Sequence, residues 1–153
     1  MPYRTSCHCG AVTIELQRRI RKLTRCNCSI CRRYGALWAN QQRKAVLVSD
    51  KTGALSGYRW GKGTLEFFHC SACGCITHYA HSERRKDGSD MCGVNMRNID
   101  DPAQIREVPI RLLDGAGTWK VLGEDVEPHL LMSPGPIAEA DAAAGDTESP
   151  APD

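Results

Sequence analysis

The chain has 153 residues, 41% of them hydrophobic and 25% charged, which suits a single domain with a modest core. The N-terminus has no apolar signal segment and no stretch is long and apolar enough to cross a bilayer, so we expect a cytoplasmic protein rather than a secreted or membrane-spanning one. The net charge of +2 is unevenly spread, because residues 133–153 contain five acidic residues and no Lys or Arg. Residues 1–132 are therefore basic, which favours an anionic partner.

Short strands separated by turns are expected along most of the chain. The alternating pattern of residues 11–17 predicts the first strand. Further strands are expected over residues 36–40, 45–49, 57–60, 64–69, 76–81, 91–96, 107–112 and 119–122. A short helical turn is expected over residues 30–35 and a loop over residues 82–90. The pattern predicts a mainly β domain over residues 1–132, followed at 133–153 by a disordered acidic tail rich in Pro and Ala.

Nine cysteines in a chain expected to be cytoplasmic indicate metal binding or thiol chemistry rather than disulfides. Seven of them fall into three clusters: Cys7 and Cys9; Cys26, Cys28 and Cys31; Cys70 and Cys73. The two distant pairs would form a four-thiolate structural zinc site, and the group of three would hold a second zinc with an open fourth position. On spacing alone, His8, His69 or Cys75 could replace a sulfur in either site.

Three ordered motifs resemble those of the glutathione-dependent formaldehyde-activating enzyme (GFA) family, which also includes centromere protein V (CENP-V). They are Cys-His-Cys-Gly-Ala-Val at 7–12, Cys-Asn-Cys-Ser-Ile-Cys-Arg-Arg at 26–33 and His-Cys-Ser-Ala-Cys-Gly at 69–74. The resemblance covers about residues 3–125 and implies the Mss4-like fold, a folded sheet stapled by zinc. It implies structural zinc ligands at Cys7, Cys9, Cys70 and Cys73, and catalytic-type zinc ligands at Cys26, Cys28 and Cys31.

The resemblance extends to two later segments. Asp114, Gly115 and Trp119 are similar to an Asp-Gly…Trp stretch of CENP-V-like members, and residues 98–102 are similar to a Leu-Asp-Asp-Pro segment. Cys75 and Cys92 depart from the residues usual at these positions. The chain is also shorter than the enzyme for which the family is named.

Two Zn²⁺ ions per chain and glutathione as a co-substrate define the first functional hypothesis. A metal-bound thiol is deprotonated at neutral pH, and such a thiolate can attack an aldehyde carbon. We therefore expect a carbon–sulfur lyase-type enzyme that acts on an adduct of glutathione, or a related thiol, with an aldehyde such as formaldehyde. Arg25, Arg32 and Arg33 flank the three-cysteine motif and could bind the carboxylates of the thiol substrate, or form a solvated face.

The alternative hypothesis is a zinc-stapled binding module whose basic face binds nucleic acid or an acidic protein, both zincs being structural. The sequence lacks known nucleic-acid-binding motifs and has few aromatic residues, so nucleic acid is not the expected partner. The expected partner is a small thiol or aldehyde substrate. The sequence is also compatible with a homodimer. Surface or supporting positions are expected for His69, His78 and His81. Cys92 is expected to be a small buried residue, and Trp38 and Trp60 to lie in the core or at its rim.

Overall fold

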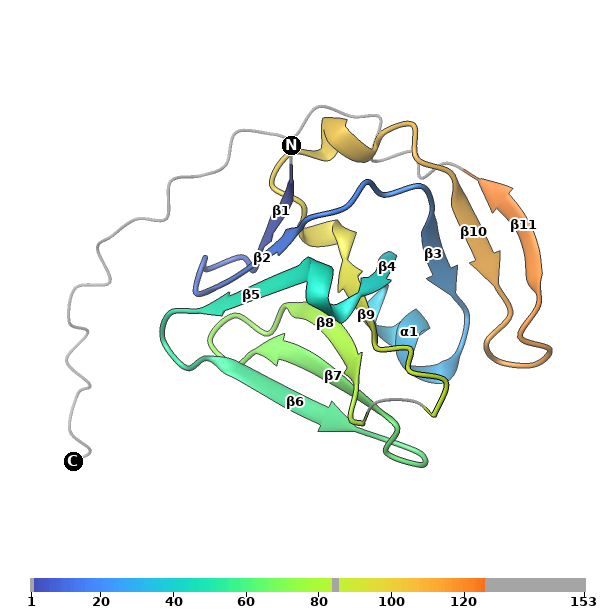
Figure 1. Cartoon of the computed structure of the whole chain (residues 1–153), viewed down its shortest axis with the longest axis horizontal. Helices are drawn as coiled ribbons and strands as arrows, with labels where there is room; N and C mark the ends of the chain where they lie inside the picture. The colour runs from blue at the N-terminus through green and yellow to red at the C-terminus, as the bar shows by residue number, and fades with distance from the viewer. Residues whose placement is uncertain (1, 84–85, 126–153) are drawn as a thin grey trace, which may run out of the picture.

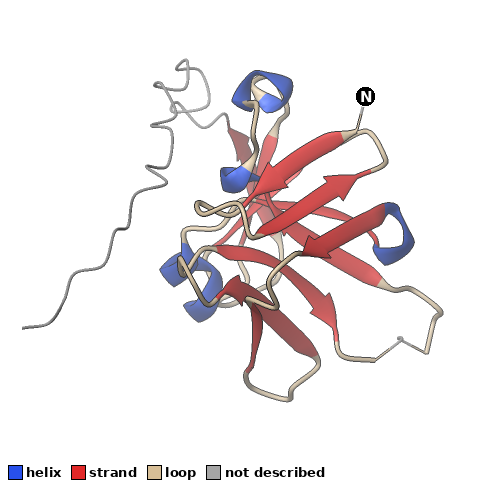
Figure 2. Cartoon of the chain, turned by 90° about the vertical axis from the view of Figure 1, so that its left-hand side faces the viewer, coloured by secondary structure: helices blue, strands red, loops and turns tan. Residues whose placement is uncertain are grey.

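Two β-sheets make up the computed structural model, which describes residues 2–83 and 86–125 (Figures 1 and 2). The smaller, antiparallel sheet has the strand order β1-β2-β5. Its strands are β1 (Tyr3–Ser6), β2 (Val12–Leu16) and β5 (Val46–Asp50). The central strand alternates buried and half-buried positions, with Val12, Ile14 and Leu16 directed into the core. This is the period of two that a sheet with one buried face requires.

The larger sheet has the strand order β11-β10-β3-β4-β9-β8-β7-β6. Its strands are β3 (Leu23–Cys26), β4 (Trp38–Gln42), β6 (Leu55–Arg59), β7 (Leu65–Cys70), β8 (Ile76–His81), β9 (Met91–Asn95), β10 (Ile110–Leu113) and β11 (Val121–Asp125). All neighbours are antiparallel except β10 and β3, which run parallel. The helical elements are α1 (Ser29–Tyr34), η1 (Arg43–Ala45), η2 (Met96–Asn98) and η3 (Pro102–Ile105). Helix α1 follows β3 and packs against it (Figure 1).

Two apolar clusters hold β3 and the loop after it in place. The main core joins Ile14 and Leu16 of the small sheet to Leu23 of β3 and Ile110 of β10, all of them almost completely buried. A second, aromatic cluster lies beside α1, where the rings of Trp38 and Tyr79 meet edge to face at 4.9 Å. Cys26, Cys28 and Cys31 belong to this second cluster, so aromatic side chains pack against the segment that carries them.

The prediction of a mainly β chain with only short helical turns is confirmed. The strand over 76–81 has the predicted bounds. Helix α1 ends at Tyr34 and is followed by Gly35, whose φ of 58° is readily adopted by glycine. Strands β1 and β3 were not predicted. In β3 the burial pattern is buried, buried, exposed, buried, which is not the alternation typical of a strand. The strand is also short and follows a run of basic residues, so the sequence pattern did not indicate it.

The expected tail at 133–153 lies outside the described residues. Among the residues that the structure describes, no helix is both long enough and apolar enough to cross a membrane.

Candidate metal centres

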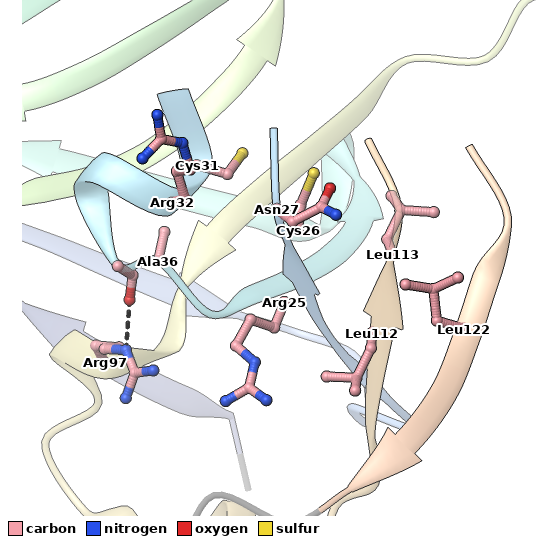
Figure 3. Close-up of a pocket in the computed structure, with 11 residues that line it drawn as sticks. Arg25, Cys26, Asn27, Cys31, Arg32, Ala36, Arg97, Leu112, Leu113 and Leu122 are labelled. Atoms are coloured by element: carbon pink, nitrogen blue, oxygen red, sulfur yellow. Dashed lines mark hydrogen bonds between the residues drawn. The ribbon is translucent and has the colours of Figure 1, made fainter. Parts of the chain in front are cut away.

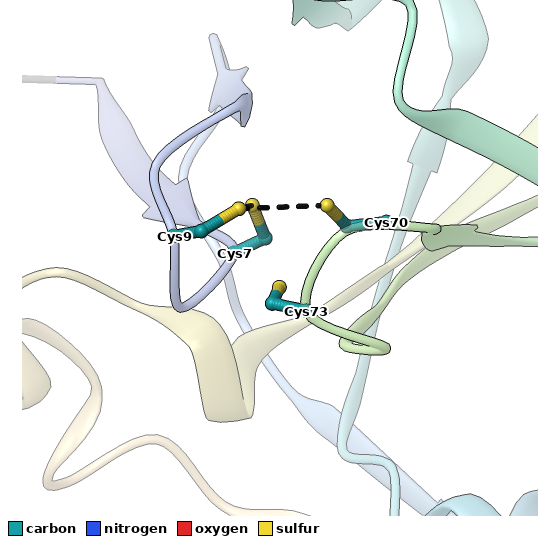
Figure 4. A group of neighbouring side chains, drawn as sticks. All are labelled: Cys7, Cys9, Cys70 and Cys73. Atoms are coloured by element: carbon teal, nitrogen blue, oxygen red, sulfur yellow. Dashed lines mark hydrogen bonds between the residues drawn. The ribbon is translucent and has the colours of Figure 1, made fainter. Parts of the chain in front are cut away.

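Four cysteines from two hairpin turns form the first group. Cys7 and Cys9 lie between β1 and β2, Cys70 ends β7, and Cys73 lies in the turn before β8 (Figure 4). Their sulfurs all lie within 4.8 Å of one another, with 3.5 Å between those of Cys7 and Cys9 and 3.6 Å between those of Cys9 and Cys70. Tetrahedral zinc with Zn–S bonds of about 2.3 Å places its sulfurs ~3.8 Å apart. The donor set and its spacing thus fit zinc.

Each of the two turns contains a glycine with a positive φ angle. Gly10 and Gly74 have φ angles of 75° and 76°, a conformation that residues with a side chain rarely adopt. Their N–H groups donate back to the carbonyl oxygens of Cys7 (2.9 Å) and Cys70 (2.7 Å). Each turn thereby presents two sulfurs to the other, and the group joins the small sheet to the large one.

Hydrogen bonds stabilise the thiolate form of Cys73 in this group. Burial raises its pKa, but the backbone N–H groups of Cys75 and Cys9 donate to its sulfur and bring that pKa down to about 6. A stabilised thiolate is the form of cysteine that binds metal.

Three buried cysteines form the second group. Cys26 ends β3, Cys28 immediately precedes α1, and Cys31 lies within the helix; their sulfurs lie within 4.8 Å of one another. The N–H of Cys28 donates to the sulfur of Cys26 at 3.5 Å, and the indole N–H of Trp38 donates to that of Cys31 at 3.3 Å. These donors favour negative charge on the sulfurs, so this group also fits a zinc site, with three protein ligands.

Hydrogen bonds in the second group stabilise the thiolate form of Cys26. The Cys31 thiol and the Cys28 backbone N–H donate to the Cys26 sulfur, outweigh the effect of burial, and lower the pKa of Cys26 to about 5. The pKa of Cys31 is raised, chiefly by the neighbouring Cys26 and by burial. A thiolate at Cys26 is therefore stable at neutral pH.

The loop between β10 and β11 is tied to the three-cysteine segment through Asn27. Its side-chain Nδ2 donates to Asp114 Oδ1 at 2.9 Å, and its Oδ1 accepts the N–H of Ala116 at 2.9 Å. The other oxygen of Asp114 accepts the N–H and hydroxyl of Thr118 at 2.9 and 2.8 Å. These bonds lower the pKa of Asp114, that from Asn27 contributing most, so the carboxylate stays charged and holds the loop.

Gly115 brings this loop against the sulfurs. A Cβ at position 115 would overlap Cys26 Sγ and lie 3.2 Å from Cys28 Cβ, so no side chain fits there. Its N–H also contributes to the lowered pKa of Cys26. The sequence offered Asp114 and Gly115 only through the resemblance, since nothing in the local pattern links them to the cysteines.

A pocket of about 380 Å³ opens beside the second group (Figure 3). Its lining residues are Arg25, Cys26, Asn27, Cys31, Arg32, Gly35, Ala36, Arg97, Leu112, Leu113 and Leu122. Two of the three predicted arginines, Arg25 and Arg32, line it. Arg33 does not: its guanidinium donates to the carbonyl of Ser29 at 2.7 Å on the exposed face of α1.

Arg97 was missed by the sequence reasoning, because it follows β9, far along the chain from the cysteines. Its Nε donates to the carbonyl oxygen of Gly35, which fixes the guanidinium at the end of α1 (Figure 3). No local sequence pattern links Arg97 to the cysteines.

The other residues singled out in the sequence are not members of either cysteine group. Among the described residues, neither group includes His8, His69 or Cys75. His78 is buried and stacks on Phe68 at 4.5 Å, and Cys92 is buried in the main core. Both tryptophans were expected in the core or at its rim; Trp38 is in the core, and Trp60 is exposed.

Comparisons with known proteins agree with the position of these motifs. The family model described as glutathione-dependent formaldehyde-activating enzyme matches residues 2–109. No curated protein matches significantly. Among solved structures, the crystal structure of a Rhodobacter sphaeroides protein, a Northeast Structural Genomics target, is 33% identical with a TM-score of 0.56, over 70% of this chain and 98% of that one. The chain belongs to the glutathione-dependent formaldehyde-activating enzyme family.

Proposed function

We propose that the protein is a zinc-dependent carbon–sulfur lyase-type enzyme that forms or cleaves the adduct of glutathione, or a related thiol, with an aldehyde. Family membership supports this reaction class. The observation that carries the proposal is that Cys26 and Cys31 line the same pocket as three arginines. A buried structural site needs no such pocket, whereas a substrate site does.

Two zinc sites with different tasks belong to the proposal. Cys7, Cys9, Cys70 and Cys73 would hold a structural zinc, closed by four thiolates. Cys26, Cys28 and Cys31 would hold the second zinc, which when bound supplies a fourth position where a substrate thiol is kept deprotonated.

The protein's own residues bind and orient the substrate. Arg25, Arg32 and Arg97 line the pocket, and their guanidinium groups would bind the carboxylates of glutathione through paired N–H donors. They also offset the negative charge that a fourth thiolate would add. Trp38 is buried against the cysteine group and donates its indole N–H to the sulfur of Cys31.

The reaction is balanced without an oxidant or reductant. The thiolate sulfur forms a bond to the carbonyl carbon, the C=O π pair moves to oxygen, and the oxygen takes up the proton that the thiol released. The reverse reaction breaks the carbon–sulfur bond and returns aldehyde and thiol.

The test is the rate of adduct formation from glutathione and formaldehyde, followed by exchange NMR and compared with the uncatalysed rate. Wild-type protein should accelerate the exchange, Cys28→Ala should not, and Cys92→Ala, which removes a buried cysteine outside both groups, should retain the activity. No acceleration with any aldehyde, together with binding of an acidic protein or nucleic acid, would favour the binding-module hypothesis instead.

A further inference from the structure

The pocket beside Cys26 has two chemically different sides. Figure 3 shows Leu113 and Leu122, carried by β10 and β11, on one side of Cys26, and Arg32 and Arg97 on the other. A ligand whose sulfur lies next to Cys26 therefore contacts arginine side chains on one side and leucine side chains on the other. Glutathione carboxylates account for the arginines, but nothing in glutathione or formaldehyde requires a wall of leucines.

The strand pairing directs one of these leucines to the pocket. Leu112 pairs with Gly123 and Leu113 pairs with Val121, so Leu122 is the extra residue of a β-bulge and has no partner on β10. Bulges re-aim a side chain and are frequent beside active sites. Leu122 lines the pocket although 65% of its surface is exposed, whereas its neighbour Val121, 50% exposed, does not.

We propose that the side formed by Leu112, Leu113 and Leu122 holds the carbon chain or ring of the aldehyde, which makes Leu122 a specificity-determining residue. The preferred substrates are then thiol adducts of apolar aldehydes larger than formaldehyde. The inference rests on the proposed function and narrows its substrate class. The reaction is R–SH plus R′–CHO giving R–S–CH(OH)–R′: a C–S bond forms, the C=O π bond breaks, and the thiol proton ends on oxygen. Formaldehyde, with R′ a hydrogen atom, has no apolar surface to bury against three leucines.

A binding experiment tests this without turnover. The probes are S-methylglutathione and S-hexylglutathione, measured by calorimetry on the zinc-loaded protein. S-hexylglutathione should bind at least about tenfold more tightly, because two or three additional buried methylene groups suffice for that ratio. Leu122→Ser should remove most of the difference, and the matched control Val121→Ser should preserve it. Equal affinities of the two probes for wild-type protein would overturn the inference.

Kinetics separate this inference from the proposed function. For wild-type protein, kcat/KM should be at least about tenfold higher for the adduct of hexanal than for that of formaldehyde, and Leu122→Ser should lower only the former. Catalysis that is equal for both aldehydes and insensitive to Leu122→Ser would refute the substrate class while leaving the proposed function in place. Absence of catalysis with every aldehyde would refute the proposed function itself, and the binding ratio would still decide whether the leucines hold an apolar group.

Discussion

Gly115→Ala is the most informative single substitution, because it perturbs the three-cysteine group without removing a ligand. The added methyl would overlap Cys26 Sγ and press on Cys28 Cβ at 3.2 Å. The backbone at Gly115 is not in the left-handed region, so the clash itself is the perturbation. Relief requires either the sulfur or the loop to move, and moving the loop breaks the hydrogen bond that Asn27 donates to Asp114 and the one that it accepts from Ala116.

The cost of such overpacking is about 1–3 kcal/mol. If about 2 kcal/mol of it falls on the second metal site, the zinc affinity there drops about 30-fold. The four-cysteine group lies in other turns, so its zinc should be unaffected. Activity should fall in parallel with occupancy of the second site.

The assay is competition for zinc with a chromophoric chelator, which resolves a weak and a strong site in one titration. The matched control is Gly123→Ala, since a Cβ at Gly123 in β11 has no atom within 4 Å and its φ is not positive. Circular dichroism monitors the fold of both variants. Unchanged affinity at both sites in Gly115→Ala, with activity intact, would refute the placement of this loop over the sulfurs.

Three further substitutions test other parts of the argument. Cys70→Ser should strongly lower the melting temperature, because it breaks the link between the two sheets; an unchanged melting temperature would contradict the four-ligand site. Cys28→Ala should stay folded by circular dichroism and retain about one zinc per chain by elemental analysis, since its group joins only neighbouring segments; two retained zincs would contradict the second site. Burial, with a smaller effect of Arg43, lowers the pKa of His78 from 6.5 to about 4. As the pH drops below 6.5, the unfolded state therefore takes up a proton at His78 before the folded state does, and stability falls. Between pH 7 and pH 5, His78 alone should lower the free energy of unfolding by about 2 kcal/mol. Urea unfolding should show a smaller loss in His78→Gln, and an equal loss in both proteins would disprove it.

Much of the fold follows from local patterns, and the exceptions have a common cause. The strand over 76–81 and the helical turn before Gly35 are coded by residues adjacent in sequence, and both are found where predicted. Strand β3 was missed because only four residues form it, and it is held by parallel pairing with β10, which lies far along the chain. Such pairing has no local signature, since its partner supplies the hydrogen bonds.

The same division applies to the candidate site. The spacing of Cys26, Cys28 and Cys31 is a property of six consecutive residues, so the sequence alone determined that these sulfurs could meet. The pairing of Cys7 and Cys9 with Cys70 and Cys73 could also be predicted, because each pair supplies only two of the four ligands that a structural zinc needs. Only the tertiary structure decided that Arg97 and Leu122 line the pocket and that Arg33 does not. Those positions depend on a bulge between β10 and β11 and on the hydrogen bond from Arg97 of η2 to Gly35 at the end of α1, which bring distant residues together through contacts no local pattern encodes.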